Sequence, residues 1–237
     1  MKILCTICAR KNSKGLKNKN IKKLYGEPLI ARTILQAKKS KLFEDIIIST
    51  DSQKIQLISK KLGLNVWFLR PSSLSNDNIN KVPVILHALK AAEKFYKKKY
   101  DAIVDLDVTA PLRKINDIKK AYNRFKINKF DILISVCKSK KNPYFNMIEI
   151  KKNKIHLVKK NKKVNSRQKA PVVYDVNASI YIWTRKALIS KKSFFSKNTG
   201  IYVMPRDRSV DIDDKDDWNL VKFYLKKNEN YRLHKKI

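Results

Sequence analysis

Cysteine is scarce in this chain of 237 residues, and long apolar runs are missing. The three cysteines, Cys5, Cys8 and Cys137, are odd in number and lack the spacing of a secreted disulfide framework, which favours a reducing compartment. Cys5 and Cys8 form a C-x-x-C, but residues three apart on a strand face opposite sides, so we expect buried structural thiols. No apolar run approaches the ~20 residues of a membrane-spanning helix, and the opening run, ended by Arg10, is too short for a secretion signal. We therefore expect a cytoplasmic protein with no membrane partner.

Acidic residues are also few. The chain has 20 of them and 55 lysines and arginines, which gives a net charge of +35. Such an excess suits a protein that binds nucleic-acid phosphates. The lysines, however, are spread over predicted helices, loops and the C-terminus, whereas a groove binder would concentrate them. We predict no dedicated nucleic-acid partner and keep a basic nucleic-acid-binding protein as the alternative from another class. An anionic ligand would still benefit from the positive field.

The length and the apolar pattern predict one α/β domain. The first 135 residues alternate short apolar runs with helical patterns, which is typical of a mostly parallel sheet covered by helices. Gly63 stands where the second helix should be capped. We predict helices that start near Pro28, Ser52, Asn80 and Asn116, and strands at residues 2–8, 45–50, 65–69, 101–106 and 131–137.

The pattern changes after residue 139, where a small excursion from the sheet is predicted. Two short strands, at 145–150 and 154–158, are joined by a turn at 152–153 and precede a lysine-rich stretch. Strands return at 176–184 and 201–204, and a last helix starts at Asp213 and runs to about residue 227. The expected parts are an α/β domain of residues 1–139 and 176–230, a protruding excursion of 140–175 and a frayed tail of 231–237.

Glycine is the third scarce residue, with four in the chain, and one of them lies in the basic loop after the first predicted strand. This loop, residues 8–20, carries four lysines, one arginine and Ser13 around Gly15. Backbone N–H groups and cations bind polyphosphates, and ligands of open α/β sheets collect beyond the carboxyl ends of the strands. The loop matches neither G-x-x-x-x-G-K nor G-x-G-x-x-G. A solvated basic loop is the alternative, but a rare glycine at this point indicates a requirement of the backbone.

Residues 209–217 hold five of the 20 acidic side chains. In an extended segment Asp211 and Asp213 face the same side, so both carboxylates can reach one hard cation such as Mg²⁺ or Mn²⁺. The alternative is that Asp213 caps the following helix and its acidic neighbours complement the helix dipole.

Asp105 and Asp107 stand at the carboxyl end of a predicted central strand. They share one face of that strand, at the edge of the sheet where ligands collect. Burial of either carboxylate without a partner would be costly. The alternative is a strand end followed by a helix cap.

In this order and spacing, a set of short motifs resembles the acylneuraminate cytidylyltransferase family over nearly the whole chain. The motifs are A-R-x-x-S-K-G with K-N-K-N at 9–20, G-E-P-L-I at 26–30, I-S-T-D-S at 48–52, R-P at 70–71 with 74–77, T-A-P-L-R at 109–113, R-Q at 167–168 and D-I-D at 211–213. Residues 142–147 and 174–181 are most similar to members that activate legionaminic acid. The resemblance implies transfer of a cytidylyl group from CTP to the anomeric hydroxyl of a nine-carbon 2-keto acid sugar, with release of pyrophosphate. It also implies a three-layer αβα fold like that of nucleotide-diphospho-sugar transferases.

Roles in nucleotide binding follow from the resemblance, residue by residue. Arg10 and Lys19 would bind the triphosphate and act in catalysis with Asp211, while Asp211 and Asp213 would hold Mg²⁺ (or Mn²⁺). The remaining nucleotide contacts would come from Ser13, Lys14 and Gly15 in the loop and from Asn20 and Arg70 at cytosine or ribose.

Sugar binding and assembly are implied in the same way. Arg167 and Gln168 would bind the sugar carboxylate, and Tyr144, Phe145 and Tyr181 would line the acyl pockets. The family's extended arm swaps across a homodimer, so residues 140–175 would reach a partner subunit, in a dimer or in a tetramer built from it.

The sequence departs from the family at two points. Lys11 and Asn12 replace small residues of the phosphate loop, and Asp107-Val108 replaces the Gln-Pro of many sialic acid enzymes. Enzymes that activate the eight-carbon sugar Kdo carry an aspartate near this point, so Asp107 is either a metal ligand or a sugar contact. Transfer to Kdo is the alternative enzyme, although the R-x-x-S-T-R-L-P opening of that group is missing here.

Overall fold

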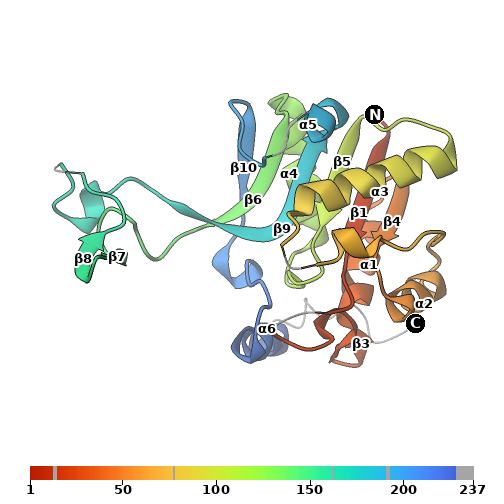
Figure 1. Cartoon of the computed structure of the whole chain (residues 1–237), viewed down its shortest axis with the longest axis horizontal. Coiled ribbons are helices and arrows are strands. Elements are labelled where there is room, and N and C mark those ends of the chain that lie inside the picture. Colours follow the sequence, from red (N-terminus) through yellow and green to blue (C-terminus); the bar gives the residue numbers. More distant parts are fainter. Residues whose placement is uncertain (13–14, 77, 162, 191–192, 228–237) are drawn as a thin grey trace.

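The computed structural model describes residues 1–12, 15–76, 78–161, 163–190 and 193–227, and its centre is a six-stranded sheet (Figure 1). The strand order is β10-β6-β9-β5-β1-β4. β1 pairs in parallel with β4 and β5, and β10 with β6, whereas β9 runs antiparallel to both of its neighbours. The predicted mostly parallel sheet is therefore confirmed, with strands β1 (Ile3–Cys8), β4 (Asp45–Ser49), β5 (Ala102–Leu106), β6 (Ile132–Lys138), β9 (Tyr174–Thr184) and β10 (Thr199–Val203).

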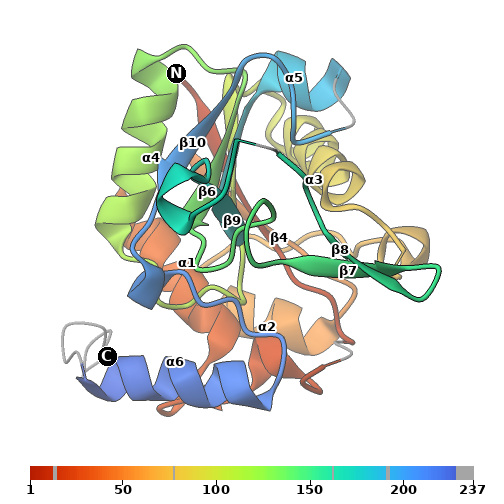
Figure 2. The same cartoon turned by 90° about the vertical axis from the view of Figure 1, so that its left-hand side faces the viewer.

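Helices cover both faces of this sheet, which completes the predicted three layers (Figure 2). One apolar core joins the sheet to α1 (Leu29–Ser40), α2 (Gln53–Lys61), α4 (Ile115–Ile127) and α6 (Lys215–Lys227). A second core joins the other face to α3 (Lys81–Tyr96) and α5 (Arg185–Ser190). Among the described residues, no helix is both long and apolar enough to cross a membrane.

Local signals explain where several of these helices begin and end. Ser52 caps α2 by accepting a hydrogen bond from the backbone N–H of Ile55, and Gly63 follows the end of α2 at φ 72°, a conformation that glycine adopts at little cost. Pro28 precedes the first turn of α1. Between β1 and α1 lie a 3₁₀ helix, η1 (Lys19–Ile21), and a two-stranded turn made by β2 (Lys23–Leu24) and β3 (Glu27–Pro28).

Several elements differ from the sequence prediction, including the starts of β9 and β10, which each lie two residues earlier than predicted. Residues 65–69 form no strand, because Trp67 stacks on Phe95 of α3, with ring centroids 4.0 Å apart, instead of extending the sheet. The first arm strand starts at Ile148 and not at 145, since the chain turns around Asn142 first. The last helix starts at Lys215, and α5 was not predicted.

Beyond Val136 and Val176, β6 and β9 continue as a paired ribbon that leaves the sheet. The ribbon carries a hairpin of β7 (Ile148–Lys151) and β8 (Lys154–Leu157), which stands well away from the body of the molecule (Figure 1). We call residues 139–173 the arm. The predicted excursion at 140–175 falls on this arm, and the predicted tail, 231–237, lies outside the described residues.

Candidate active site

A cleft of about 460 Å³ opens beyond the carboxyl ends of β1 and β5. Three segments that are far apart in the sequence form its walls: the basic loop after β1, the end of β5, and residues 209–214, which we call the acidic strap. The lining residues are Cys8, Arg10, Gly15, Lys19, Asn20, Asp107, Thr109, Asp211 and Asp213. The structure thus brings together most of the nucleotide and metal candidates that the sequence suggested.

The basic loop is held by a hydrogen bond within itself and by contacts to the acidic strap. Asn20 Nδ2 donates to the backbone oxygen of Arg10 at 3.0 Å. Lys19 Nζ lies 3.0 Å from Asp213 Oδ1 and also donates to the backbone oxygen of Ile212. A Cβ at Gly15 would collide with the backbone oxygen of Asp213, so the loop needs a glycine there to approach the acidic strap. Ser13 and Lys14 lie outside the described residues.

The acidic strap is held by its backbone and leaves the carboxylates of Asp211 and Asp213 for the cleft. Ile212 is fully buried, and its N–H donates to the backbone oxygen of Thr109 at 2.9 Å. Asp214, not Asp213, caps α6, because its Oδ1 accepts hydrogen bonds from the N–H groups of Asp216 and Asp217. The capping alternative for Asp213 is therefore wrong, and its side chain remains 78% exposed beside Lys19.

Asp211 is the unusual carboxylate of this group. Its Oδ1 is buried without a hydrogen-bond partner. Burial, followed by the charges of Asp107 and Asp213, raises the pKa of Asp211 to about 6, against the opposing effects of Thr109 and Lys19. A buried carboxylate oxygen without a donor, next to a second carboxylate, fits a hard divalent cation.

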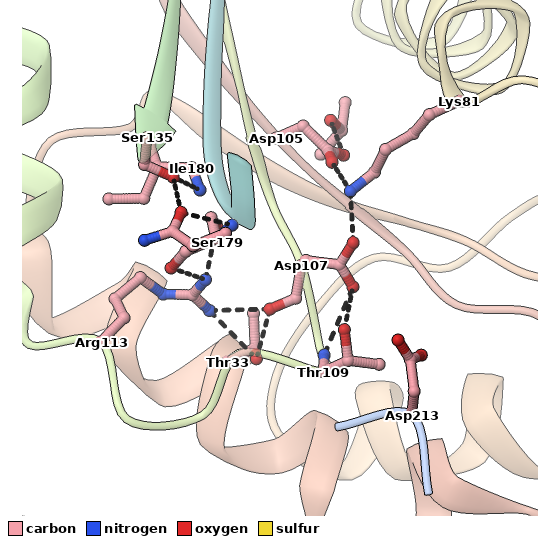
Figure 3. Close-up of polar contacts among 12 residues, drawn as sticks. Thr33, Lys81, Asp105, Asp107, Thr109, Arg113, Ser135, Ser179, Ile180 and Asp213 are labelled. Atoms are coloured by element: carbon pink, nitrogen blue, oxygen red, sulfur yellow. Dashed lines mark hydrogen bonds and ion pairs between the residues drawn. The ribbon is translucent and has the colours of Figure 1, made fainter. Parts of the chain in front are cut away.

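Asp107 projects into the cleft from beyond β5, and Lys81 and Thr109 hold its side chain (Figure 3). Lys81 Nζ lies 2.5 Å from Asp107 Oδ2 and 2.9 Å from Asp105 Oδ2. Asp105 is fully buried and accepts a hydrogen bond from Thr6 Oγ1 at 2.7 Å. Burial alone would shift each pKa towards the neutral form, but the opposite charges prevail, so the pKa of Lys81 is raised and that of Asp107 lowered.

Arg113 fixes the backbone below this cluster. It is 1% exposed and donates to the backbone oxygens of Ser179, at 2.6 Å, and of Asp107, at 3.0 Å (Figure 3). Further bonds reach Thr33 and Gln36 of α1. Burial lowers the pKa of Arg113 to about 10, so the guanidinium still carries its charge at neutral pH. Arg113 therefore connects α1, β9 and the end of β5.

Sequence reasoning missed Lys81. In so lysine-rich a chain nothing distinguished a lysine at the start of a helix from the others. The spacing of Asp105 and Asp107 was the available signal, because two carboxylates on one face of a buried strand require a cation.

Two predicted site residues lie behind the cleft rather than in its lining. Arg70 is 7% exposed and donates from Nη2 to the backbone oxygen of Ser49 at 2.6 Å. Tyr181 is also 7% exposed and packs with Trp183 and Phe194 in the second core. A second cavity, of about 310 Å³, shares Asn20 with the cleft and is lined further by Lys11, Asn18, Ile21, Asp51, Ser52, Gln53, Lys54, Ile55 and Leu69.

The four remaining sugar candidates lie on the arm. Arg167 and Gln168 belong to the 3₁₀ helix η3 (Arg167–Lys169), and Tyr144 and Phe145 lie in the turn before β7. The arm extends away from the body of its own chain (Figure 1). Within one chain the structure therefore does not bring these four residues to the other site candidates.

Comparison with known proteins assigns a family. The cytidylyltransferase family matches residues 4–235. The chain is 46% identical over 223 residues to CMP-N,N'-diacetyllegionaminic acid synthase of Campylobacter jejuni, with 94% of each chain covered. It is 45% identical over 224 residues to post-translational flagellin modification protein B of Campylobacter coli, covering 94% of this chain and 95% of that one. Among solved structures, CMP:2-keto-3-deoxy-manno-octonic acid synthetase complexed with CTP shares the fold, with a TM-score of 0.68, 12% identity, and coverage of 96% and 99%.

Proposed function

The chain belongs to the cytidylyltransferase family, and we propose that it transfers the cytidylyl group of CTP to the anomeric hydroxyl of a nine-carbon 2-keto acid sugar, releasing pyrophosphate. The observation that carries the proposal is the convergence of Arg10 and Lys19 with Asp211 and Asp213 on one cleft at the carboxyl ends of the strands. Cations on one wall and carboxylates on the other suit a triphosphate that is bound together with a divalent metal ion.

Legionaminic acid is the proposed sugar type, with sialic acid as the next candidate. The relative named as a CMP-N,N'-diacetyllegionaminic acid synthase shares 46% of its residues with this chain over nearly its full length. The likeness to the Kdo enzyme lies in the fold, at 12% identity, so Kdo is retained as the alternative acceptor.

The chain's own residues would position the reactants and stabilise charge. Arg10 and Lys19 would bind the triphosphate, together with Gly15 and with Ser13 and Lys14. Asn20, which the cleft shares with the second cavity, would contact the ribose or cytosine, with Arg70 behind it. The anomeric hydroxyl would then attack the α-phosphorus in line, and no covalent enzyme intermediate is required.

Asp211 and Asp213 would hold Mg²⁺ or Mn²⁺. The buried, unpartnered Oδ1 of Asp211 supports this assignment. When bound, the ion would neutralise the phosphates and favour ionisation of the attacking hydroxyl.

The arm supports a homodimer, or a tetramer built from it. Apolar side chains on its hairpin are largely exposed, including Ile148 at 61%, Ile150 at 73% and Ile155 at 70%, and such side chains suit burial against another chain. Arg167, Gln168, Tyr144 and Phe145 would then reach the partner's cleft, while Tyr181 would support its own acyl pocket. Because CTP is a cytosolic nucleotide, the proposal includes a cytoplasmic location.

Pyrophosphate release tests the proposed function. Purified protein with CTP and Mg²⁺ is given N,N'-diacetyllegionaminic acid, N-acetylneuraminic acid, pseudaminic acid or Kdo. The highest kcat/KM is expected with the legionaminic acid. Turnover of Kdo alone would favour the alternative enzyme, and no pyrophosphate with any of the four sugars would contradict the proposal.

A further inference from the structure

Lys81 is enclosed by partners at the back of the cleft. Its Nζ lies between Asp105 and Asp107, at 2.9 and 2.5 Å, and 4.7 Å above the ring centroid of Tyr181. Its side chain is 21% exposed, and the residue does not line the cleft. A positive charge at a helix N-terminus is locally unfavourable, so the two carboxylates, not the start of α3, hold the ammonium in place.

Asp107 is the member of this cluster that reaches the cleft. Its Oδ1 accepts hydrogen bonds from the N–H and the Oγ1 of Thr109, at 3.3 and 3.2 Å, while Oδ2 is occupied by Lys81. An ionised carboxylate offers about four acceptor positions. One position, on Oδ2, therefore remains for a ligand.

The neighbouring ammonium decides which ligand suits that position. A metal ion bound at Asp107 Oδ2 would share the oxygen with the ammonium of Lys81 and would be repelled by it. Lys19 contacts Asp213 in a similar way, but that carboxylate is 78% exposed and its pair can separate when a ligand arrives. Lys81 is confined by Asp105 and Tyr181. A neutral hydroxyl group, which donates a hydrogen bond and carries no charge, fits Asp107 better.

We propose that Lys81 is a positioning residue for sugar recognition, which holds Asp107 as a fixed acceptor for a hydroxyl group of the sugar substrate. The inference rests on the proposed function. It decides between the two roles that the sequence left open for Asp107, in favour of the sugar contact.

The test is the double substitution Lys81→Met with Asp105→Asn. Lys81→Met alone would leave Asp105, which is 0% exposed, buried without a cation, and the second change removes that charge as well. Thr6 can still donate to the new amide oxygen. With whichever sugar the unaltered chain turns over, the KM for the sugar should rise about tenfold or more, since a fixed hydrogen bond to a charged group is lost. The KM for CTP and the melting temperature should stay close to those of the unaltered chain.

Lys98 provides a matched control at the other end of α3. Its Nζ also contacts two carboxylates, Glu44 at 2.8 Å and Asp45 at 2.7 Å, lies over the rings of Tyr96 and Tyr100, and is 23% exposed on its side chain. Lys98→Met with Asp45→Asn should leave both KM values unchanged.

Three outcomes would overturn the inference. An unchanged KM for the sugar in the Lys81 variant would overturn it directly. An equal rise in the Lys98 control would show a general effect of losing a partly buried ion pair. No turnover by the unaltered chain with any of the four sugars would overturn the proposed function, and this inference with it.

Discussion

Lys19 reaches across the cleft to Asp213, whose Oδ1 lies 3.0 Å from its Nζ although the two residues are 194 positions apart in the sequence. The contact joins the basic loop to the acidic strap. In the proposed reaction the pair would separate, so that Lys19 could bind the phosphates of CTP and Asp213 could hold a divalent metal ion.

Lys19→Ala should reduce kcat several-hundred-fold, because the loss of one transition-state contact to a phosphate costs about 3 to 4 kcal/mol. Steady-state kinetics with varied CTP measure this, and Lys17→Ala, an exposed lysine of the same loop, is the control. A rise in the KM for CTP with kcat unchanged would make Lys19 a binding residue only.

Asp211→Asn should remove metal-dependent turnover and, without metal, make the folded protein more stable at pH 8. The folded-state pKa of about 6 lies above the ~3.9 of an unfolded aspartate. Ionisation therefore destabilises the fold, with no effect below about pH 4 and a full effect, of up to about 3 kcal/mol, above about pH 6.

Thermal unfolding in EDTA between pH 4 and pH 8 measures the effect of Asp211→Asn. In EDTA, the stability of the variant relative to the unaltered chain should increase as the pH rises. In a second series with Mg²⁺, the variant should lack the increase in melting temperature that is expected for the unaltered chain. Asp216→Asn, at the exposed start of α6, should show no such gain. A variant that is equally or less stable at pH 8 would contradict the burial of a charged Asp211.

Gly15→Ala and Gly26→Ala should fail in different ways. At Gly15 a Cβ meets the backbone of the acidic strap, so the cleft must open and the KM for CTP should rise. Gly26 has φ 90° and open space around it, so alanine there should cost about 1 to 2 kcal/mol of stability and leave the kinetics unchanged. Equal CTP kinetics in the two variants would show that Gly15 does not shape the cleft.

Two inactive variants should restore activity when they are combined. If the arm serves the partner's cleft, a mixed dimer of Arg167→Ala and Asp211→Ala chains has one intact site and one doubly altered site. After co-expression, the unseparated population should show about a quarter of the unaltered activity, because half of randomly assembled dimers are mixed and each of these has one intact site of two. Mixed dimers isolated through two different affinity tags should show about half. Activity no higher than that of either variant alone would place Arg167 in its own chain's site or in no site.

Much of the body of the molecule was predictable, because buried strands and amphipathic helices have periods that can be read locally. Ser52 and Gly63 marked the ends of α2, and the need for glycine at position 15 was visible from its rarity. The strand predicted at 65–69 was wrong because its apolar run packs on α3, and a local pattern does not show which partner a run will choose.

The site was predictable only where a local pattern was sufficient. The spacing of Asp105 and Asp107 placed them on one face, but the cation between them comes from the start of α3, which only the packing of that helix brings near. Likewise, the sequence did not show that Asp214 would cap α6 and leave Asp213 to the cleft, since several acids in a row offer equivalent caps.

The most direct test of the account is backbone amide hydrogen exchange with and without CTP and Mg²⁺. The basic loop and the acidic strap should both gain protection with the nucleotide, whereas the arm hairpin should not. Protection of one of the two segments without the other, or of neither, would contradict the central claim that they bind a single triphosphate between them.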